Sequence, residues 1–226
     1  KGAHVNLPQE LMQRTLSALK AACAFRRHLL KHGGAIHITS TAKKFYAVEK
    51  GFVRLTSIQS TGRQVTRVLL GRGALFGELP FVPNLEMLEE VALANGPTAV
   101  LEFDCLSAER AMQSSLELQR LLIEALGAQL QILSRRLQWQ QTDPLEKRVA
   151  MVLYDLMCFG GTPCGHGPGY AMDIRLTHEE LAEIVGAARP SVSAVLGKLH
   201  QKELISSTRS YLCIRSLERL KHQLSQ

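Results

Sequence analysis

The chain has no long apolar run, no paired-cysteine motif and no catalytic signature, and each absence excludes a class of protein. No apolar run reaches the roughly 18 residues of a membrane span, and the first residues, KGAHVNLPQE, do not resemble a secretory signal. We therefore expect a cytoplasmic protein with no membrane partner. The sequence also has no nucleophile–base pair, metal-ligand spacing or phosphate-binding loop, so an enzyme is the poorest interpretation.

The cysteines are five in number, odd and scattered: Cys23, Cys105, Cys158, Cys164 and Cys213. They form neither a disulfide framework nor a CxxC pair. Buried, reduced thiols are the expected state. A redox pair between Cys158 and Cys164 is the alternative.

Length and charge bound the organisation of the chain. With 226 residues it has room for two modest domains, each with its own core. The formal net charge of +7 suggests an anionic partner, but the excess is uneven. Residues 1–142 carry seventeen Lys and Arg against eleven Asp and Glu, whereas residues 143–226 carry ten against nine. Charge therefore adds little to the case for nucleic-acid binding by the C-terminal part, and a solvated basic surface is the simpler interpretation of the rest.

Three patterns divide the N-terminal part. Leucine spacing predicts helix from residue 1 to about residue 32, before Gly33 and Gly34. Short β-branched and aromatic segments separated by glycines predict a compact antiparallel barrel or roll over residues 35–104. Residues 115–140 read as one long helix with a heptad seam, which favours a parallel dimer over simple docking on the barrel. The seam residues, spaced 3, 4, 3 and 4, are Ile123, Leu126, Leu130, Leu133 and Leu137.

The next signals mark a domain boundary near Thr142. Asp143, Pro144 and Glu146 have the order of an N-cap, a first-turn proline and a capping-box acid, so a new helix is expected there. Residues 159–170 form a Gly- and Pro-rich loop, and alternating apolar residues predict a strand over residues 172–176.

Residues 178–197, HEELAEIVGAARPSVSAVLG, carry the most specific pattern, that of a helix-turn-helix. Thr177 and Glu180 predict a capping box at the first helix, and Gly186 stands where the chain must turn. The second helix, about residues 190–201, would enter the major groove by its N-terminal residues. A hairpin from LISS and YLCIR and a short helix over residues 216–226 complete a winged helix-turn-helix. An ordinary helical hairpin is the alternative.

These motifs, in this order, resemble the catabolite activator protein and fumarate-nitrate regulator (CRP/FNR) superfamily of bacterial transcription factors. The resemblance covers nearly the whole chain and rests on YAVEKGFVRLTS, STGRQVTRVLLGRGALFGELPF, the heptad helix and LTHEELAEIVGAARPSVSAVLGKLHQKELIS. The C-terminal half, with KRVAMVLYDL and TPCGHGPGYAMDIRLTHEELAEIVG, is most similar to the cyanobacterial global nitrogen regulator branch.

The resemblance implies an α+β fold of three parts. Residues 1–113 would form an effector-sensing, cyclic-nucleotide-binding-like β-roll with an N-terminal helix, residues 114–142 a dimerisation helix, and residues 143–226 a winged helix-turn-helix DNA-binding domain. A homodimer would bind a palindromic operator in double-stranded DNA. RNA polymerase or another regulator would be a further partner.

The resemblance also implies which residues contact DNA. Arg189 is the leading base-reading residue, because the arginine fork matches guanine O6 and N7; a phosphate contact is the alternative. Serines and threonine would hold phosphates or orient the helix, although Ser193 also fits a plain surface role. The implied DNA-binding set is Thr177, His178, Arg189, Pro190, Ser191, Ser193 and Lys198.

The recognition helix departs from the activator protein at two positions. Pro190 and Ala194 stand where that relative carries a glutamate and a second arginine, and neither side chain can hydrogen-bond a base. The operator sequence of the activator protein therefore does not predict the operator of this chain. Pro190 also disfavours helical geometry at Arg189, which places the arginine at the cap of the helix.

The sensor domain departs from the family's known effector sites. Leu88 and Glu89 stand where cyclic-nucleotide members have an Arg-Ser pair, and a carboxylate would repel the phosphate, so cyclic AMP is disfavoured. Glu89 and Gln129 replace the arginines that bind 2-oxoglutarate in the nitrogen regulators, so that ligand is disfavoured too. The sensor positions lack the Cys and His pair that would bind haem, so haem is disfavoured. An iron–sulfur cluster needs four thiolates and the N-terminal region offers only Cys23, so a cluster is disfavoured too.

Two hypotheses for control of the regulator stay open. An anionic effector such as cyclic di-GMP would suit the basic N-terminal half, where arginines can stack on guanine and bind phosphate. The basic residues are Arg26, Arg27, Lys31, Lys43, Lys44, Arg54, Arg63, Arg67 and Arg72. The candidate effector residues are Arg63, Arg67, Phe76, Gly77, Glu78, Leu79, Gln129 and Leu133. The other hypothesis is a sensor that has lost its ligand, leaving a DNA binder controlled by abundance or by a protein partner.

Overall fold

The computed structural model describes residues 7–39, 42–58, 64–80, 90–165, 169–172, 174–207 and 212–224. The chain divides into two compact units, Lys1–Leu133 and Ser134–Gln226. Helix α3 (Leu116–Thr142) is continuous through this division. The α+β fold class expected from the sequence is confirmed, and each unit is described by itself below.

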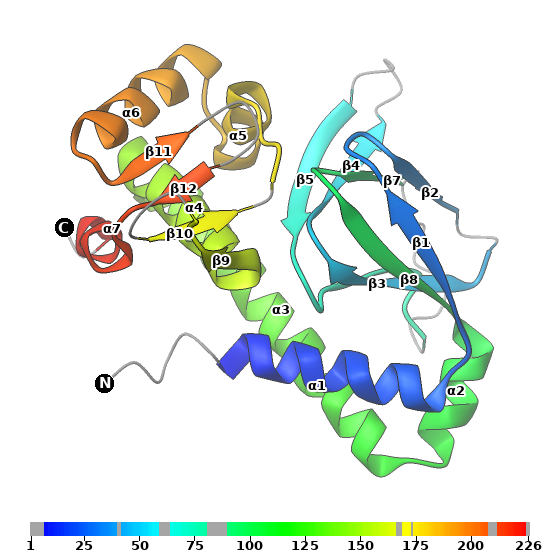
Figure 1. Cartoon of the computed structure of the whole chain (residues 1–226). Helices are drawn as coiled ribbons and strands as arrows, with labels where there is room; N and C mark the ends of the chain where they lie inside the picture. The colour runs from blue at the N-terminus through cyan, green and yellow to red at the C-terminus, as the bar shows by residue number, and fades with distance from the viewer. Residues whose placement is uncertain are drawn as a thin grey trace. The chain divides into compact units, whose positions relative to one another are not determined.

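The N-terminal unit is a β-roll whose described residues form two four-stranded antiparallel sheets (Figure 1). The first sheet has the strand order β1-β8-β3-β6 and the second the order β2-β7-β4-β5. The strands are β1 (Phe25–Leu30), β2 (Ala35–Ile38), β3 (Lys44–Lys50), β4 (Val53–Ile58), β5 (Gln64–Leu70), β6 (Leu75–Gly77), β7 (Glu90–Ala94) and β8 (Thr98–Asp104). Helices α1 (Leu7–Ala22) and α2 (Cys105–Gln113) pack with the first part of α3 against the first sheet.

Strand β3 contributes side chains to two hydrophobic cores, because successive side chains alternate between the two faces of the first sheet. Phe45 and Ala47 pack with α1, α2 and α3 in what we term the helix-side core. Tyr46 and Val48 pack against the second sheet in the inter-sheet core. Both faces of this strand are buried, which explains why its sequence is an apolar run and does not alternate with polar residues.

The helix predicted up to about residue 32 is wrong beyond α1. Residues 25–30 form strand β1, which pairs with β8 without a break from Phe25↔Phe103 to Leu30↔Thr98. Backbone hydrogen bonding to β8 outweighs the local helical spacing, which is a weak preference on its own. Residues 1–6 lie outside the described part of the chain. Strands β6 and β7 and helix α2 are additional elements that the sequence patterns did not predict.

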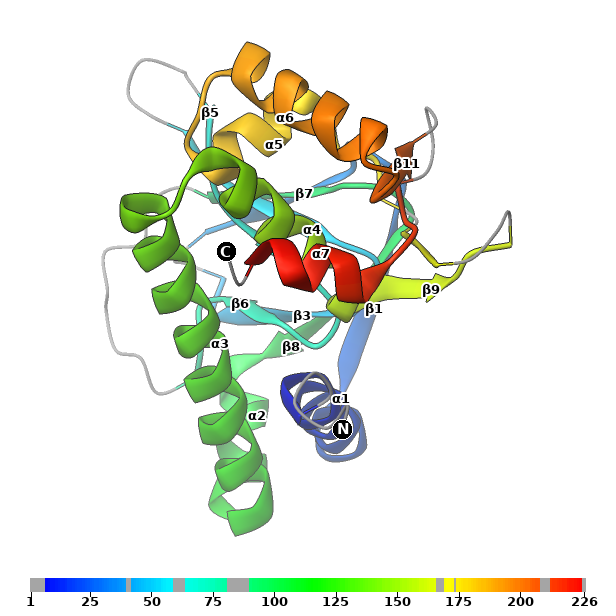
Figure 2. The same cartoon turned by 90° about the vertical axis from the view of Figure 1, so that its left-hand side faces the viewer.

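The C-terminal unit is a winged helix-turn-helix. Its elements after α3 are α4 (Leu145–Gly160), β9 (Gly161–Pro163), β10 (Tyr170–Met172), α5 (His178–Val185), α6 (Arg189–Gln201), β11 (Ile205–Ser207), β12 (Leu212–Ile214) and α7 (Leu217–Leu224). Their strands form an antiparallel sheet with the order β11-β12-β10-β9. Helix α7 packs along α4 (Figure 2). Inside this unit, Arg136 Nε on α3 lies 3.2 Å from Asp155 Oδ2 on α4.

Two local predictions in this unit need correction. Helix α4 starts at Leu145 after an extended Pro144 and has no side-chain cap, because Asp143 pairs with Lys147 at 3.3 Å and Glu146 with Lys202 at 2.8 Å. The strand expected over residues 172–176 ends at Met172, and residues 174–177 are irregular. The predicted Gly- and Pro-rich loop contributes its first residues to α4 and β9.

Candidate nucleic-acid interface

Helix α5 begins with the predicted capping box. The Thr177 hydroxyl accepts a hydrogen bond from the Glu180 backbone N–H at 3.1 Å, and the Glu180 carboxylate accepts one from the Thr177 N–H at 2.8 Å. Two backbone donors of the first turn are thereby satisfied. Leu181, Ala182 and Val185 are buried, which fixes the inner face of α5.

The turn between α5 and α6 depends on Gly186. This residue has φ 65° and ψ 52°, a left-handed conformation that side chains with a Cβ rarely adopt. A Cβ at this position would meet only Arg148 Nη1, at 3.8 Å. The glycine is therefore required for backbone conformation and not for space.

Two distant side chains bind the end of α5, and neither was predicted from the sequence. Arg148 Nη1 on α4 donates to the Val185 carbonyl at 2.7 Å, and Gln140 Nε2 on α3 donates to the Ile184 carbonyl at 3.0 Å. The last carbonyls of a helix have no partner within it, so these bonds fix the turn from outside. Their sequence separations of 37 and 44 residues leave no local signal.

Helix α6 begins at Arg189, one residue earlier than expected. Ala188 has the extended geometry of an N-cap, and its carbonyl accepts from the Val192 N–H at 3.2 Å. Arg189 is therefore the first helical residue and not the cap. Val192, Val195 and Leu199 are buried against the unit.

The outer face of α6 is exposed and carries most of the predicted DNA-binding residues. Arg189, Pro190, Ser191 and Lys198 are exposed, and so is Ala194. No side chain caps the helix, and Arg189 and Ser191, which carry the first backbone N–H groups, are exposed, so the positive end of the helix dipole lies at the surface. This face combines one arginine, a lysine and a hydroxyl with a helix N-terminus.

The other predicted DNA-binding residues have partners inside the unit. His178 Nδ1 lies 2.8 Å from Ser193 Oγ, a contact that joins the start of α5 to α6. Thr177 is held in the capping box. The His178–Ser193 contact joins the two helices and the Thr177 capping box fixes the start of α5, while Arg189, Pro190, Ser191 and Lys198 are exposed.

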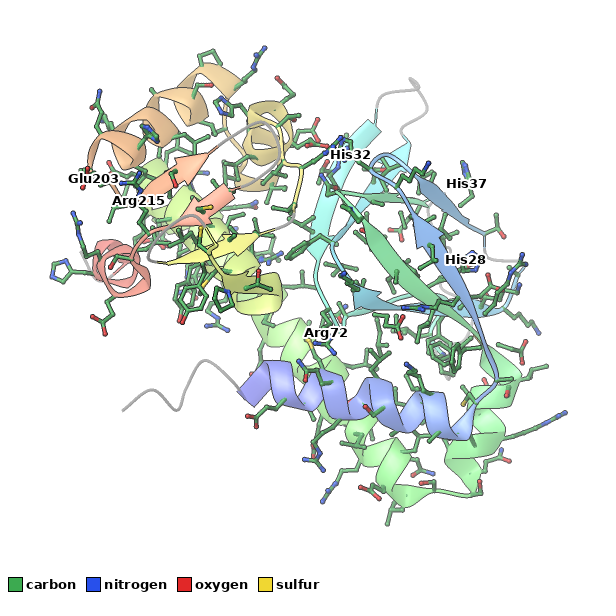
Figure 3. The ribbon with its side chains drawn as sticks, in the orientation of Figure 1. His28, His32, His37, Arg72, Glu203 and Arg215 are labelled. Carbon is green, nitrogen blue, oxygen red and sulfur yellow. The ribbon has the colours of Figure 1, made fainter. Side chains whose placement is uncertain are left out.

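The wing follows α6 and is formed by β11 and β12, whose register runs from Ile205↔Ile214 to Ser207↔Leu212. Arg215 and Glu203 lie beside one another at the base of this hairpin (Figure 3), with Arg215 Nη1 3.9 Å from Glu203 Oε1. Both side chains are about half exposed or more, so this long pair contributes little.

The predicted effector segment lies at the edge strand β6 of the N-terminal unit. Phe76 is buried and stacks on Tyr46 with ring centroids 5.3 Å apart, so it is part of the inter-sheet core. Gly77 has φ 90°, and a Cβ there would lie 2.9 Å from Tyr46 Cδ2. Leu79 packs on the helix-side core, whereas Glu78 Oε2 is buried and has no hydrogen-bond partner in the described part of the chain.

Gln129 of α3 binds the same edge strand. Its Oε1 accepts from the Leu75 N–H at 3.1 Å and its Nε2 donates to the Leu75 carbonyl at 2.9 Å, a pairing we call the Gln129 clamp. The clamp satisfies the backbone of a strand edge in the way a neighbouring strand would. Leu133 is half-buried on the same helix. Arg63 and the Arg67 side chain lie outside the described part of the structure.

The predicted basic surface of the N-terminal unit is partly neutralised by internal partners. Arg27 and Lys20 bind Glu49 at 2.6 and 2.8 Å, and Arg54 donates to Thr66 at 3.0 Å. Arg26, Lys31, Lys43 and Arg72 are exposed, and Figure 3 labels Arg72. Fewer unpaired positive charges are therefore exposed on this unit than the charge count indicates.

Glu102 binds a lysine and a histidine on the first sheet. Lys44 Nζ lies 2.5 Å from Glu102 Oε1, and His28 Nε2, labelled in Figure 3, lies 2.8 Å from Oε2. Burial acts to raise the pKa of Glu102, but the hydrogen bonds from Lys44 and His28 outweigh it and hold the pKa below its usual range. Glu102 therefore stays ionised in the folded unit at neutral pH.

The heptad seam of α3 is exposed along one line only. Leu116, Ile123, Leu130 and Leu137 follow one another at seven-residue intervals and are 80, 69, 65 and 62% exposed. Leu126 packs partly against the helix-side core, and Leu133 is half-buried. An apolar line of this length on a helix surface is typical of an interface.

Within the described residues, no helix is long and apolar enough to cross a membrane. The same residues contain no group of three or more His, Cys, Asp or Glu side chains placed to hold a metal ion.

Two domain families match the chain and agree with this geometry. Residues 27–115 match the cyclic nucleotide-binding domain, and residues 147–223 match the Crp-like helix-turn-helix domain. Together they define a transcription regulator in which a cyclic nucleotide-binding domain precedes a DNA-binding helix-turn-helix.

Known proteins are similar over most of the chain. The global nitrogen regulator of Nostoc is 27% identical over 166 residues, which cover 73% of this chain and 74% of that protein. A CRP/FNR family regulator from Thermus thermophilus superposes with a TM-score of 0.66 at 25% identity, covering 89% of this chain and 99% of the other. FixK2 from Bradyrhizobium japonicum gives a TM-score of 0.71 at 19% identity, with coverages of 88% and 97%. The chain belongs to the CRP/FNR family of transcription regulators.

Proposed function

We propose that the chain acts as a homodimer that reads a palindromic operator through the outward face of α6, with Arg189 as the principal base-reading residue. The observation that carries this proposal is the exposed, uncapped N-terminus of α6 with Arg189 as its first residue. An arginine at this end of a recognition helix can reach base edges in the major groove.

The neighbours of Arg189 shape its specificity. Pro190 and Ala194 are exposed on the same face and offer no hydrogen bond to a base. Ser191 and Lys198 suit phosphate oxygens, which position the helix without reading sequence. Direct readout in each half-site therefore concentrates on one arginine and its guanine.

Selection of bound duplexes from a random DNA pool, followed by footprinting, tests this reading. A protected palindrome with half-sites about one helical turn apart is expected. Arg189→Ala should cost about 1–3 kcal/mol of binding free energy and relax preference at one base pair per half-site. Lys198→Ala is the matched control and should weaken binding equally on all sequences, lowering the salt slope by about one. Absence of any protected palindrome refutes the proposal.

Dimerisation is supported by the exposed apolar line on α3. Four large apolar side chains that are 62–80% exposed lie at one heptad position, which is the pattern of one side of a coiled-coil seam. A second copy of the same helix presents the complementary line, as a two-fold interface requires.

The interface is tested by Leu130→Glu, with Gln131→Glu as the control on the neighbouring exposed position. Sedimentation equilibrium should show a dimer for the parent chain and the control, and a monomer for Leu130→Glu, because the substitution places like charges in an apolar seam. A parent chain that stays monomeric at micromolar concentration rules out this interface.

We propose a small anionic effector for the N-terminal domain, with cyclic di-GMP as the first ligand to test. The match to the cyclic nucleotide-binding domain supports an effector site at β6. Glu78 Oε2 is buried there and has no hydrogen-bond partner among the described residues, and such an atom favours a ligand that brings an N–H or hydroxyl donor, as guanine and ribose do.

The alternative is a ligand-independent regulator controlled by abundance or by a protein partner, and the Gln129 clamp favours it. Gln129 already binds both backbone groups of Leu75, so α3 is joined to the effector segment without a ligand. Calorimetry with cyclic di-GMP, cyclic AMP and 2-oxoglutarate separates the two proposals. Mass spectrometry of small molecules released from freshly purified, denatured protein extends the test to other effectors. If none of the three ligands gives a heat of binding and no small molecule is released, the ligand-independent alternative is supported.

A further inference from the structure

Two thiols meet in the sheet of the C-terminal unit. Cys164, the residue after β9, has its Sγ 3.4 Å from the Sγ of Cys213, the middle residue of β12. Both cysteines are free and half-buried, and they are 49 residues apart in the sequence. The sequence suggested Cys158 as the partner of Cys164, and the Cys158 side chain lies outside the described structure.

Gly169 explains how the two thiols come together. Strand β10 lies between β9 and β12, so side chains on the two outer strands are ordinarily separated by two strand spacings, roughly 9.5 Å. Gly169 has φ 116°, and a Cβ there would lie 2.2 Å from the Ile214 carbonyl oxygen. Its carbonyl accepts from the Cys164 N–H at 2.9 Å. The close approach of Gly169 to β12 thus carries Cys164 toward Cys213.

The other described cysteines are placed differently. Cys23 and Cys105 are buried in the helix-side core. Burial raises the pKa of Cys23, and burial followed by nearby carboxylates raises the pKa of Cys105 to about 12. Both side chains are therefore poor nucleophiles shielded from reagents.

Within the pair, the two sulfurs have different roles. Burial, together with the hydrogen bond and proximity of Cys164, raises the pKa of Cys213, so Cys213 keeps its proton. Cys164 follows the end of β9, whereas Cys213 lies inside β12, and this position assigns Cys164 as the attacking sulfur. Cys213 is the resolving thiol, 3.4 Å away.

We propose that Cys164 and Cys213 form an oxidation site that a hydroperoxide converts to an intrachain disulfide. The Cys164 thiolate attacks the terminal peroxide oxygen, the O–O bond breaks, and an alcohol or water leaves after protonation. Cys213 then attacks the sulfur of the resulting sulfenic acid, forming the S–S bond and releasing water. Two thiols and one hydroperoxide thereby give one disulfide, one alcohol or water, and one water. A thiol reductant reverses the reaction by exchange.

The geometry requires little movement. The two sulfurs must approach from 3.4 Å to a bond length of about 2.05 Å. Cys164 follows the last β9–β10 pair, Pro163↔Tyr170, so a shift of its backbone strains its hydrogen bond to the Gly169 carbonyl but breaks no strand pair. The product would tie this turn to the wing strand β12 and restrict the wing. Any effect on DNA affinity rests on the proposed function, whereas formation of the disulfide does not.

Treatment of the intact chain with hydrogen peroxide, followed by peptide mapping under non-reducing conditions, tests the proposal. We expect a cross-linked peptide pair containing Cys164 and Cys213, lighter than the two free peptides by two hydrogens and released by dithiothreitol. Cys164→Ser should abolish the cross-link, and Cys23→Ser, the matched control, should leave it unchanged.

A second readout uses the parent chain and so does not depend on the folding of a variant. Oxidation should raise the thermal midpoint of the C-terminal unit, and dithiothreitol should restore the original value. Over-oxidation of either cysteine without a cross-link, or cross-links only between chains, overturns the proposal. A cross-link with no change in DNA binding leaves the oxidation site in place and refutes only its link to the proposed function.

Discussion

The contact of Arg148 with the end of α5 yields a quantitative prediction about the helix-turn-helix. Arg148→Met keeps the length and apolar stem of the side chain but removes the guanidinium. The bond lost is a charge-assisted one of 2.7 Å from Nη1 to the Val185 carbonyl. A second contact, 3.4 Å to the Gly186 carbonyl, is too long to contribute much.

The expected magnitude is a balance of two effects. A hydrogen bond to a charged group contributes about 1.5–3 kcal/mol. Arg148 Nε is buried without a hydrogen-bond partner, and removing that atom returns about 1 kcal/mol of desolvation cost. The free energy of unfolding of the C-terminal unit should therefore fall by about 0.5–2 kcal/mol.

The assay follows from the position of the single tryptophan. Trp139 lies in the part of α3 that belongs to the C-terminal unit, so its fluorescence during urea unfolding reports on that unit. Lys147→Met on the same helix is the control, since it removes a half-buried i,i+4 pair with Asp143, and a pair with this spacing on a helix contributes about 0.5 kcal/mol or less. Equal losses in the two variants, or none for Arg148→Met, would refute the capping role.

Three further predictions concern other parts of the molecule. Gly186→Ala should lower the free energy of unfolding of the C-terminal unit by about 1 kcal/mol in the same fluorescence assay, because alanine disfavours the left-handed backbone. Gly169→Ala should lower it by at least twice as much, because the new Cβ would lie 2.2 Å from a carbonyl oxygen. Burial acts to raise the pKa of Glu102, but the hydrogen bonds from Lys44 and His28 outweigh it and lower the pKa. The stabilisation from ionised Glu102 is present above the unfolded pKa and is lost as pH falls below about 4.3, so Glu102→Gln should flatten the acid limb of a thermal-midpoint profile. Gln129→Ala should destabilise the N-terminal unit by about 1–3 kcal/mol and speed hydrogen exchange at the Leu75 amide, which it leaves unpaired.

Local signals made the helix-turn-helix predictable. The capping box at Thr177, the left-handed Gly186 and the buried spacing of α5 and α6 each depend on residues within one or two turns. Strand β1 was mistaken for helix because its conformation is set by pairing with β8, more than seventy residues later in its first pairs. The spacing of residues near position 25 therefore cannot indicate that this segment pairs with β8.

The candidate site shows the same division. The outward position of Arg189 follows from helix periodicity, and its exposure agrees with the expectation. The contacts of Arg148 with α5 and of Cys164 with Cys213 join residues 37 and 49 positions apart, and only the folded chain brings them together. The sequence drew attention to Gln129 because it replaces an arginine of the nitrogen regulators. Its hydrogen bonds to Leu75 could not be predicted, because Leu75 lies 54 residues away.

The pairing of β1 with β8 also has a consequence for synthesis of the chain. Phe25 pairs with Phe103, and Thr15 Oγ1 on α1 donates to the Leu121 carbonyl at 3.2 Å, 106 residues later. A nascent chain that stops short of β8 leaves the whole of β1 without its partner, including exposed Phe25 and Leu29. A strand without its partner exposes unpaired backbone N–H and carbonyl groups, which favour aggregation. The N-terminal unit can therefore complete its folding only after β8 and the first part of α3 have left the ribosome.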